Sequence, residues 1–449
     1  MFFFSTSRKN HRFFIYLCKE NNQKRIQMKK AFKPTAIFLL FILVAISCGN
    51  KNNSNNDSTH VDSQNDVEEK EDIIVKINDD GTTNGNHVFA SRDEKTFYLD
   101  YVGYEIVQSH IDVKAYDLAA IEGNVKIESK ININNNTYEV LRIAENAFYG
   151  CQRMTSVSIP SSVRMIRESA FELCPNLTSV KFSDGLENIG KKAFSRCEKL
   201  LSIIIPSSVD YIGEMAFGST SSLESIVVEK SNDVYDSRND CNAIIESATN
   251  TLIQGCKATV IPDNIVKIGP DAFWYCKDLI SIDIPNSVVS IGHGAFVCCE
   301  KLKSLQIPNS VTEIGRMAFS GCSNLESLNI PNSVDEIGSR AFNDCSKLTT
   351  ISIPDKVSKI EAELFSGCTN LQTVKFGSGV ESIIGDWVFE GCPNLNTIVV
   401  SSTTPPHVSY SAFLKMEVEP WDVELHVPKE AVEEYKKARY WKDFTIVGD

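Results

Sequence analysis

The sequence lacks an apolar run long enough to cross a bilayer as a helix. Residues 36–47 form a run of 12 mostly apolar residues, whereas a spanning helix needs about 20. Positive charge is also scarce, because 45 Lys and Arg residues stand against 58 Asp and Glu residues and leave a net charge of −13. Nucleic acids and anionic lipid surfaces are bound by clustered cations, so this balance argues against both as partners.

Catalytic and metal-binding signatures are missing as well. The seven His residues are scattered, and only His293 falls inside a regular repeat. The sequence has no P-loop, GxSxG, HExxH or dinucleotide fingerprint. Its 14 Cys residues include no CxxC pair and have no His cluster nearby, which argues against a metal site. We therefore expect a non-enzymatic protein that needs no metal or cofactor.

The segment before residue 49 is typical of an export signal. A basic stretch begins at Met28, the apolar run follows, and small Ser47 stands before Cys48. The run has the length of a signal h-region. Its end is similar to a bacterial lipobox, in which the Cys thiol is acylated and becomes the mature terminus. We predict residues 1–47 as a signal region whose true start is Met28, with Cys48 lipidated. A conventionally cleaved or uncleaved signal is the alternative.

One residue type then sets the period of the chain. Phe recurs at steps of 23 or 24 residues, with one longer step of 56 residues. The series consists of Phe148, Phe171, Phe194, Phe217, Phe273, Phe296, Phe319, Phe342, Phe365 and Phe389, with an eleventh at Phe413. A fixed period of this length is the signature of a solenoid, in which each coil buries its apolar side only against its neighbours. The series predicts about 10–11 coils.

The positions around each Phe predict the architecture of a coil. Residues nine and eleven after Phe are apolar, and this spacing of two indicates a short strand with both side chains pointing inward. Five before Phe stands Ile, and four before it usually stands Gly, which we expect to allow a tight bend. We therefore predict one parallel strand, a turn, a second extended piece and another turn per coil, without an ordinary helix.

Nine coils carry a Cys three residues after Phe. Equivalent sites on stacked coils cannot all pair, so we predict buried free thiols. The long step holds an insert at about 233–262, in which two apolar stretches flank residues 247–250 and predict a β-hairpin that projects from the solenoid. A turn centred after Ala248 places Cys241 opposite Cys256. A cross-strand disulfide and two free thiols both remain open there.

The remaining segments complete the domain plan. Residues 48–72 are polar and almost free of apolar side chains, which predicts a disordered tether beyond the lipid. Residues 73–142 alternate in short runs and predict a β-rich cap, and the solenoid follows over 143–401. Residues 402–449 are expected to cap the other end, with a final strand at 423–428 and a short amphipathic helix over 429–441.

The strand residues eight and ten after Phe are expected to point outward. The first of these rows is nearly uniform Ser or Thr, whereas the second varies from coil to coil. A varied exposed row on a repeating frame is typical of a binding surface, and lack of constraint on solvated positions is the other interpretation. We predict ligand contacts at Lys181, Ile204, Val227, Asp283, Gln306, Asn329 and Lys375.

The phrase LxSIxIPxSVxxIGxxAFxxC, clearest at 307–329, resembles the BspA-like leucine-rich repeats of bacterial surface lipoproteins over about residues 140–400. The resemblance implies a right-handed, curved leucine-rich-repeat solenoid with a parallel sheet on one face. It also implies adhesion or protein binding as the function, and NCNAII…TLIQGC inserts similar to this one interrupt the family's repeats.

We therefore expect a lipoprotein of the outer membrane that binds a protein at the cell surface, such as a host matrix protein or another bacterial surface protein. A structural envelope protein that faces the periplasm is the alternative.

Overall fold

The structure is a computed structural model. It describes residues 74–75, 88–90, 96–99, 101–115, 118–133 and 136–449, all of which lie in the compact unit Lys70–Asp449. The predicted signal region, Cys48 and the tether lie outside the described residues. Among the residues that are described, no helix combines the length and apolar character needed to cross a membrane.

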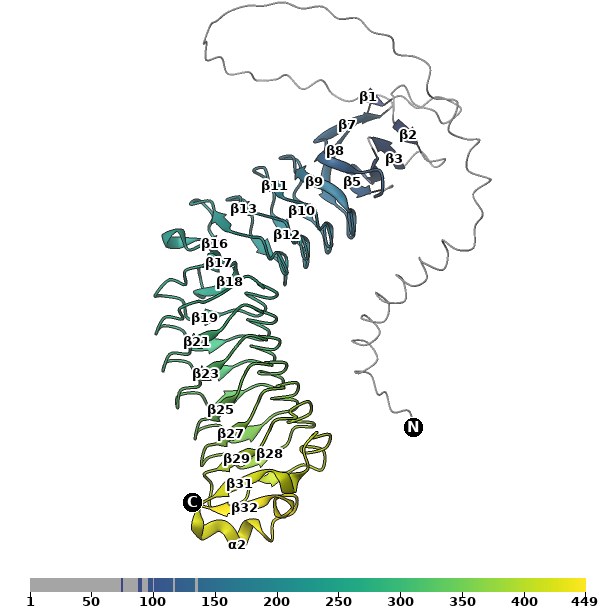
Figure 1. Ribbon diagram of the computed structural model, residues 1–449. Helices are drawn as coiled ribbons and strands as arrows, with labels where there is room; N and C mark the ends of the chain where they lie inside the picture. The colour runs from purple at the N-terminus through teal and green to yellow at the C-terminus, as the bar shows by residue number, and fades with distance from the viewer. Residues whose placement is uncertain (1–73, 76–87, 91–95, 100, 116–117, 134–135) are drawn as a thin grey trace, which may run out of the picture. The chain divides into compact units, whose positions relative to one another are not determined.

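The repeats fold as coils of a β-solenoid, as the period predicts. Regular coils contribute an outer strand after the Phe, except after Phe273, and a two-residue strand before it, and most equivalent strands of neighbouring coils pair in parallel (Figure 1). The outer strands are β9 (Arg153–Ser158), β11 (Ser179–Lys181), β13 (Ser202–Ile205), β15 (Ser225–Val228), β21 (Ser304–Gln306), β23 (Ser327–Asn329), β25 (Thr350–Ile353), β27 (Thr373–Phe376) and β29 (Thr397–Val400). The short strands are β10 (Met165–Ile166), β12 (Asn188–Ile189), β14 (Tyr211–Ile212), β19 (Lys267–Ile268), β20 (Ser290–Ile291), β22 (Glu313–Ile314), β24 (Glu336–Ile337), β26 (Lys359–Ile360), β28 (Ser382–Ile383) and β30 (His407–Val408).

The recurrent Phe side chains form the spine of the core. From Phe148 to Phe389 they are fully buried. Neighbouring rings stack with centroid separations of 4.9–6.1 Å, except between Phe217 and Phe273. These separations fall in the range that aromatic pairs prefer. The Phe ring of each coil is thus buried in part by the ring of the neighbouring coil.

The Cys ladder consists of free thiols, which confirms that prediction. All nine of its members are buried and unpaired. In seven coils the Sγ donates a hydrogen bond of 3.1–3.3 Å to the Phe carbonyl of the preceding coil. Burial raises the pKa of the Cys322 thiol. The thiol therefore acts as a small packing group with one donor, and it links adjacent coils.

Native thiol labelling should reflect this burial. Among the twelve described Cys residues, only Cys298 is partly exposed. Because a reagent needs an accessible thiolate, we expect disulfide-exchange labelling at pH 8 to modify Cys298 before Cys322 or Cys299. Peptide mapping by mass spectrometry measures the order. Equal labelling of Cys298 and Cys322 in the folded protein would contradict the packed ladder.

The turns around each Phe differ from the prediction in their backbone. Residues two before and two after Phe adopt positive φ, for example Met317 at 56° and Gly321 at 74°. The Gly four before Phe has no positive φ, but the predicted turn begins there, because Ala318 N donates a 3.2 Å hydrogen bond to Gly315 O. A Cβ at Gly315 would lie 2.6 Å from the backbone N of His293 in the preceding coil. Gly is used there because two backbones approach closely.

The insert forms the predicted hairpin but does not project. Its strands β16 (Tyr235–Asp236), β17 (Ala243–Glu246) and β18 (Thr251–Gly255) are consecutive in one sheet, and β18 continues in parallel to β19. Ala243, Ile244 and Ile245 are all fully buried. Because successive strand residues point to opposite faces, three apolar residues in a row require burial on both faces.

The hairpin separates two hydrophobic cores. Ile244 and Cys256 pack into the core of the preceding coils, whereas Cys241, Ala243 and Ile245 pack into that of the following coils. Gly255 occupies the position of the Phe in a regular coil, because its N–H donates to Ala272 O as a Phe N–H does to the Ala of the next coil. A side chain at Gly255 would overlap the Phe273 ring. The Phe stack is therefore interrupted at this seam.

Cys241 and Cys256 are free thiols rather than a disulfide. The register places Glu246 opposite Thr251 as predicted, but a bulge between Ile244 and Ile245 shifts the pairing by one residue. Beyond the bulge the two Cys side chains enter different cores. A single extra residue thus removes the predicted cross-strand arrangement.

The solenoid extends further toward the amino terminus than the sequence predicts. β5 (His110–Ala115) pairs in parallel with β8 (Asn136–Ile143), and β8 with β10. β6 (Glu122–Lys126) pairs in parallel with outer strand β9. An additional coil therefore precedes the predicted start at residue 143. The other described strands of this end are β1 (Ile74–Val75), β2 (Val88–Ala90), β3 (Thr96–Leu99), β4 (Val102–Val107) and β7 (Lys130–Ile133).

The carboxyl end also continues the outer sheet. β31 (Glu424–Val427) pairs in parallel with β29, and β32 (Thr445–Gly448) pairs in parallel with β31. The strand predicted at 423–428 is therefore present but is not the last. With these additions the solenoid has about 13 turns, more than the predicted 10–11.

The helix predicted over 429–441 is much shorter. Only α2 (Val432–Tyr435) is α-helical, between the 3-10 segments η3 (Lys429–Ala431) and η4 (Trp441–Asp443). Tyr440 has φ 69°, which ends helical geometry before η4. Tyr435 and Trp441 are nevertheless fully buried. Another 3-10 segment, η2 (Pro420–Asp422), precedes β31.

Candidate functional site

The outward rows of the outer strands form one candidate surface. The strand residues alternate as predicted, with those nine and eleven after Phe inward and those eight and ten after it outward. β25 shows the pattern clearly, because Thr350 and Ser352 are exposed while Ile351 and Ile353 are buried. We call the positions ten after Phe, together with the residues paired to them in the terminal strands, the outer row.

The structure places the predicted contact residues on this row. Lys181, Ile204, Val227, Asp283, Gln306, Asn329 and Lys375 are all exposed. Ile204 and Val227 are direct partners in neighbouring strands, as are Gln306 and Asn329. Lys375 lies next to Ser352 on one side and Val399 on the other.

The row is interrupted at the insert, and its strand ladder also breaks between β23 and β25. β15 ends one sheet and β21 begins another, and the intervening residues 281–284 are not paired as a strand. The N–H of Val228 donates to Ser237 Oγ of the insert instead of to a neighbouring strand. A side-chain hydrogen bond from the insert thus satisfies the edge of β15, and no strand-to-strand hydrogen bonds connect Val227 to Asp283.

An apolar patch lies on and beside the row, next to this interruption. We define the patch as Leu201, Ile204 and Val227, whose exposed fractions are 50%, 56% and 43%. Ile204 and Val227 are cross-strand partners in β13 and β15, and Leu201 precedes β13 in the same coil. Exposed apolar groups that gather in this way mark interaction sites more often than isolated ones do.

Three further members of the row were missed from the sequence. Lys126 pairs with Ser158 at one end, and His426 and Val447 continue from Val399 at the other. The alternation in residues 424–427 was a usable signal, because Leu425 and Val427 match the inward positions. No comparable Phe-based phrase precedes Lys126 or Val447.

His426 has the clearest electrostatic environment on the row. Its Nδ1 lies 2.9 Å from Asp449 Oδ1, and its Nε2 lies 3.2 Å from Glu424 Oε2. The hydrogen bond with Asp449, followed by that with Glu424, raises the pKa of His426 despite the opposing effect of burial. The imidazolium therefore links strand β31 to the chain end.

This link predicts a pH dependence. A raised folded-state pKa gives stability that is fully present below the unfolded pKa of about 6.5 and is lost as pH rises through the folded value. We expect wild type to exceed His426→Gln in stability by on the order of 0.5 kcal/mol in mild acid, because the acidic partners are exposed. Thermal midpoints at about pH 5.5 and 8.5 test this. A difference that persists unchanged at the higher pH would refute the ion pair as its cause.

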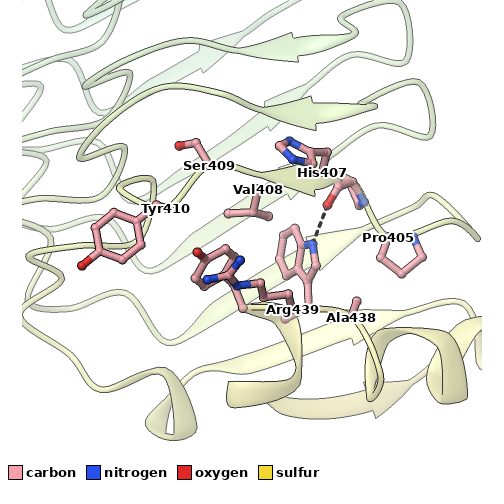
Figure 2. A pocket seen from close by; sticks show the side chains of 10 residues that line it. Pro405, His407, Val408, Ser409, Tyr410, Ala438 and Arg439 are labelled. Atoms are coloured by element: carbon pink, nitrogen blue, oxygen red, sulfur yellow. Dashed lines mark hydrogen bonds between the residues drawn. The ribbon is translucent and has the colours of Figure 1, made fainter.

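A pocket of about 430 Å³ lies at the carboxyl end, between β30 and the segment that joins α2 to η4 (Figure 2). It is lined by Pro405, Pro406, His407, Val408, Ser409, Tyr410, Ala438, Arg439, Tyr440 and Trp441. Trp441 Nε1 donates a 2.8 Å hydrogen bond to Pro406 O, which fixes one wall. The Arg439 guanidinium stacks over the Tyr440 ring at 4.8 Å.

The described residues offer little for covalent or metal chemistry. No group of three or more His, Cys, Asp or Glu side chains in this part of the chain is arranged to hold a metal ion. The ladder thiols are buried and bonded to carbonyls, which makes them poor nucleophiles. The exposed features are instead a varied strand row and one cationic, aromatic pocket, both of which suit binding.

Comparison with known proteins agrees with the fold. The model of the BspA-type leucine-rich repeat region (6 copies) matches residues 123–242, 254–346 and 290–419. The crystal structure of the pneumococcal vaccine antigen PcpA is similar over 81% of this chain and 98% of its own, at 17% identity and a TM-score of 0.50. A leucine-rich repeat protein from Eubacterium ventriosum is similar over 71% and 94%, at 21% identity and a TM-score of 0.54.

At these identities the two structures establish the fold alone, and no curated protein matches the sequence. The repeat model, by contrast, covers more than half of the residues and coincides with the coils seen in the structure. The chain therefore belongs to the family of BspA-type leucine-rich repeat proteins.

Proposed function

We propose that this protein is a non-enzymatic binding protein of the cell envelope whose outer row contacts a protein partner. The observation that carries the proposal is the outer row itself, where side chains vary while the inward positions repeat, and where the apolar patch is exposed to solvent. Leucine-rich repeat solenoids are suited to this use because stacked strands present one extended surface.

Charge reversal tests the row. The variant Lys181→Glu, Asp283→Lys, Lys375→Glu should lose capture of the partner. Its matched control is Lys267→Glu, Glu313→Lys, Lys359→Glu, which makes the same charge changes at exposed positions on short strands. Both proteins are compared with wild type on immobilised collagen, fibronectin and laminin and on intact bacterial cells. Equal capture by the two variants would remove the outer row as the binding surface.

The apolar patch is tested separately. Ile204→Ser with Val227→Ser should weaken capture by about tenfold or more, as expected when exposed anchor residues are truncated. Val260 and Ile384 are also exposed, so the double Ser variant at those positions is the control. Thermal midpoints should remain within a few degrees for both, because neither pair is part of the core.

We further propose that the chain is exported and anchored in the outer membrane through a lipid on Cys48, and that it serves adhesion at the cell surface. The supporting evidence is the signal-like sequence before Cys48 and the polar stretch after it. Metabolic labelling with a radioactive fatty acid should mark wild type and not Cys48→Ser. Protease treatment of intact cells should remove the solenoid. A lipidated protein that resists the protease would favour the periplasmic scaffold instead.

A further inference from the structure

The pocket beside η4 is cationic in an acidic protein. The chain carries 58 acidic and 45 basic residues, yet none of the ten pocket residues is Asp or Glu. Arg439 and His407 both line the pocket. The acidic residues of the adjoining α2 are already engaged, because Glu433 pairs with Lys436 and Glu434 with Lys437. The local surroundings therefore favour a negatively charged ligand.

The pocket also holds polar groups that the described residues leave without partners. Arg439 forms no ion pair or hydrogen bond in this part of the chain, and neither does the His407 ring. Stacking on Tyr440 fixes the plane of the guanidinium and leaves its N–H edge available. A planar guanidinium held in this way presents the paired donors that match a carboxylate.

The backbone supports the same arrangement. Tyr440 adopts φ 69°, a conformation that costs a bulky L-residue roughly 1–2 kcal/mol. This residue precedes buried Trp441, and its ring centroid lies 4.8 Å from the Arg439 guanidinium. Positive φ also occurs in the turns of the regular coils, so at Tyr440 it marks a turn, and the stacking contact is what holds the Arg439 side chain in place.

The remaining lining residues indicate that the ligand is larger than a simple anion. The volume of about 430 Å³ is in the range of sites that hold several groups. Pro405, Val408 and Ala438 provide apolar surface, and Tyr410 is 72% exposed at the rim. Such a surface accommodates the apolar part of an extended chain segment that carries the acid.

We propose that this pocket binds a carboxylate of an extended peptide segment, with Arg439 as its principal partner. The segment's neighbouring side chains lie against Pro405, Val408 and Tyr410. The carboxylate is either the α-carboxylate of a chain end or an Asp or Glu side chain. This site is separate from the outer row and does not depend on the function proposed for that row.

A synthetic hexapeptide array provides the test, with full-length protein as the analyte. One arm compares peptides with a free C-terminal carboxylate with their carboxamides, and a second arm replaces Asp and Glu by Asn and Gln. We expect wild type to bind the carboxylate forms about tenfold more tightly in one arm, a difference of about 1.4 kcal/mol. The arm that shows the preference identifies the source of the carboxylate.

Two variants connect that preference to the pocket. Arg439→Gln should lose it, whereas Lys442→Gln should keep it, because Lys442 is a nearby exposed cation that does not line the pocket. The charge-reversed outer-row variant should also keep it. The proposal is overturned if no peptide binds, if neutral and acidic peptides bind equally, or if Arg439→Gln behaves as wild type.

Discussion

Replacing Phe319 with Ala should lower the free energy of unfolding by about 3–5 kcal/mol, as expected for removal of a fully buried aromatic ring. Phe319 stacks on Phe296 at 5.4 Å and on Phe342 at 6.0 Å. The substitution therefore removes two ring contacts and leaves a cavity inside a stack that cannot close without bringing whole coils together. Denaturant unfolding followed by circular dichroism measures the loss.

Two comparisons show whether the ring itself is responsible. Phe319→Leu keeps most of the volume and should cost less than the Ala variant. Ile204→Ala removes an apolar side chain that is 56% exposed and should change stability by no more than about 0.5 kcal/mol. A Phe319→Ala variant as stable as Ile204→Ala would mean that the stack contributes little.

The seam at the insert should limit how far the loss of local stability in Phe319→Ala extends along the solenoid. Phe319 belongs to the core that begins at Cys241, whereas Phe171 belongs to the other core. Coils interact mainly with their neighbours in a repeat protein. Amide hydrogen exchange in Phe319→Ala should therefore speed up over 273–413 and remain near wild type over 148–217. The reciprocal pattern is expected for Phe171→Ala. Uniform acceleration in both variants would show that the seam transmits cooperativity fully.

The regular coils were predictable because each position is repeated many times within one chain. The inward residues such as Val157 and Ile159, the buried Cys ladder and the outward row all followed from internal comparison. The candidate contact residues were accessible for the same reason. Their location depends only on the two-residue alternation of a strand, which the inward partners fix.

The errors arose where the repeat carries no internal comparison. The bulge between Ile244 and Ile245 shifts the pairing of β17 with β18, and Cys241 and Cys256 enter different cores. The apolar stretch 243–245 predicts one side of a projecting hairpin, whereas in the structure it lies between the two cores. The carboxyl-terminal pocket was not predicted at all. Its lining includes Tyr440 at a positive φ of 69°, and local sequence gives no reason to place a Tyr in that conformation.

The glycines before each Phe predict a bend, but the sequence does not show which atoms crowd them, because close contact between coils is a tertiary property. Gly315→Ala should destabilise the protein by about 3 kcal/mol, at the upper end for overpacking. The added Cβ would lie 2.6 Å from His293 N and 2.7 Å from Gly292 C, and neither backbone atom can move without shifting the preceding coil.

Two control variants separate backbone strain from crowding. Gly150 has φ 75° but open space around it, so Gly150→Ala should lower the stability by about 1–2 kcal/mol through strain alone. Glu361 occupies the Gly315 position in its own coil with a side chain already present, so Glu361→Ala should have little effect. Denaturant midpoints of the three variants decide the matter: if Gly315→Ala were no worse than Glu361→Ala, the coils would not be held as closely as their backbones indicate.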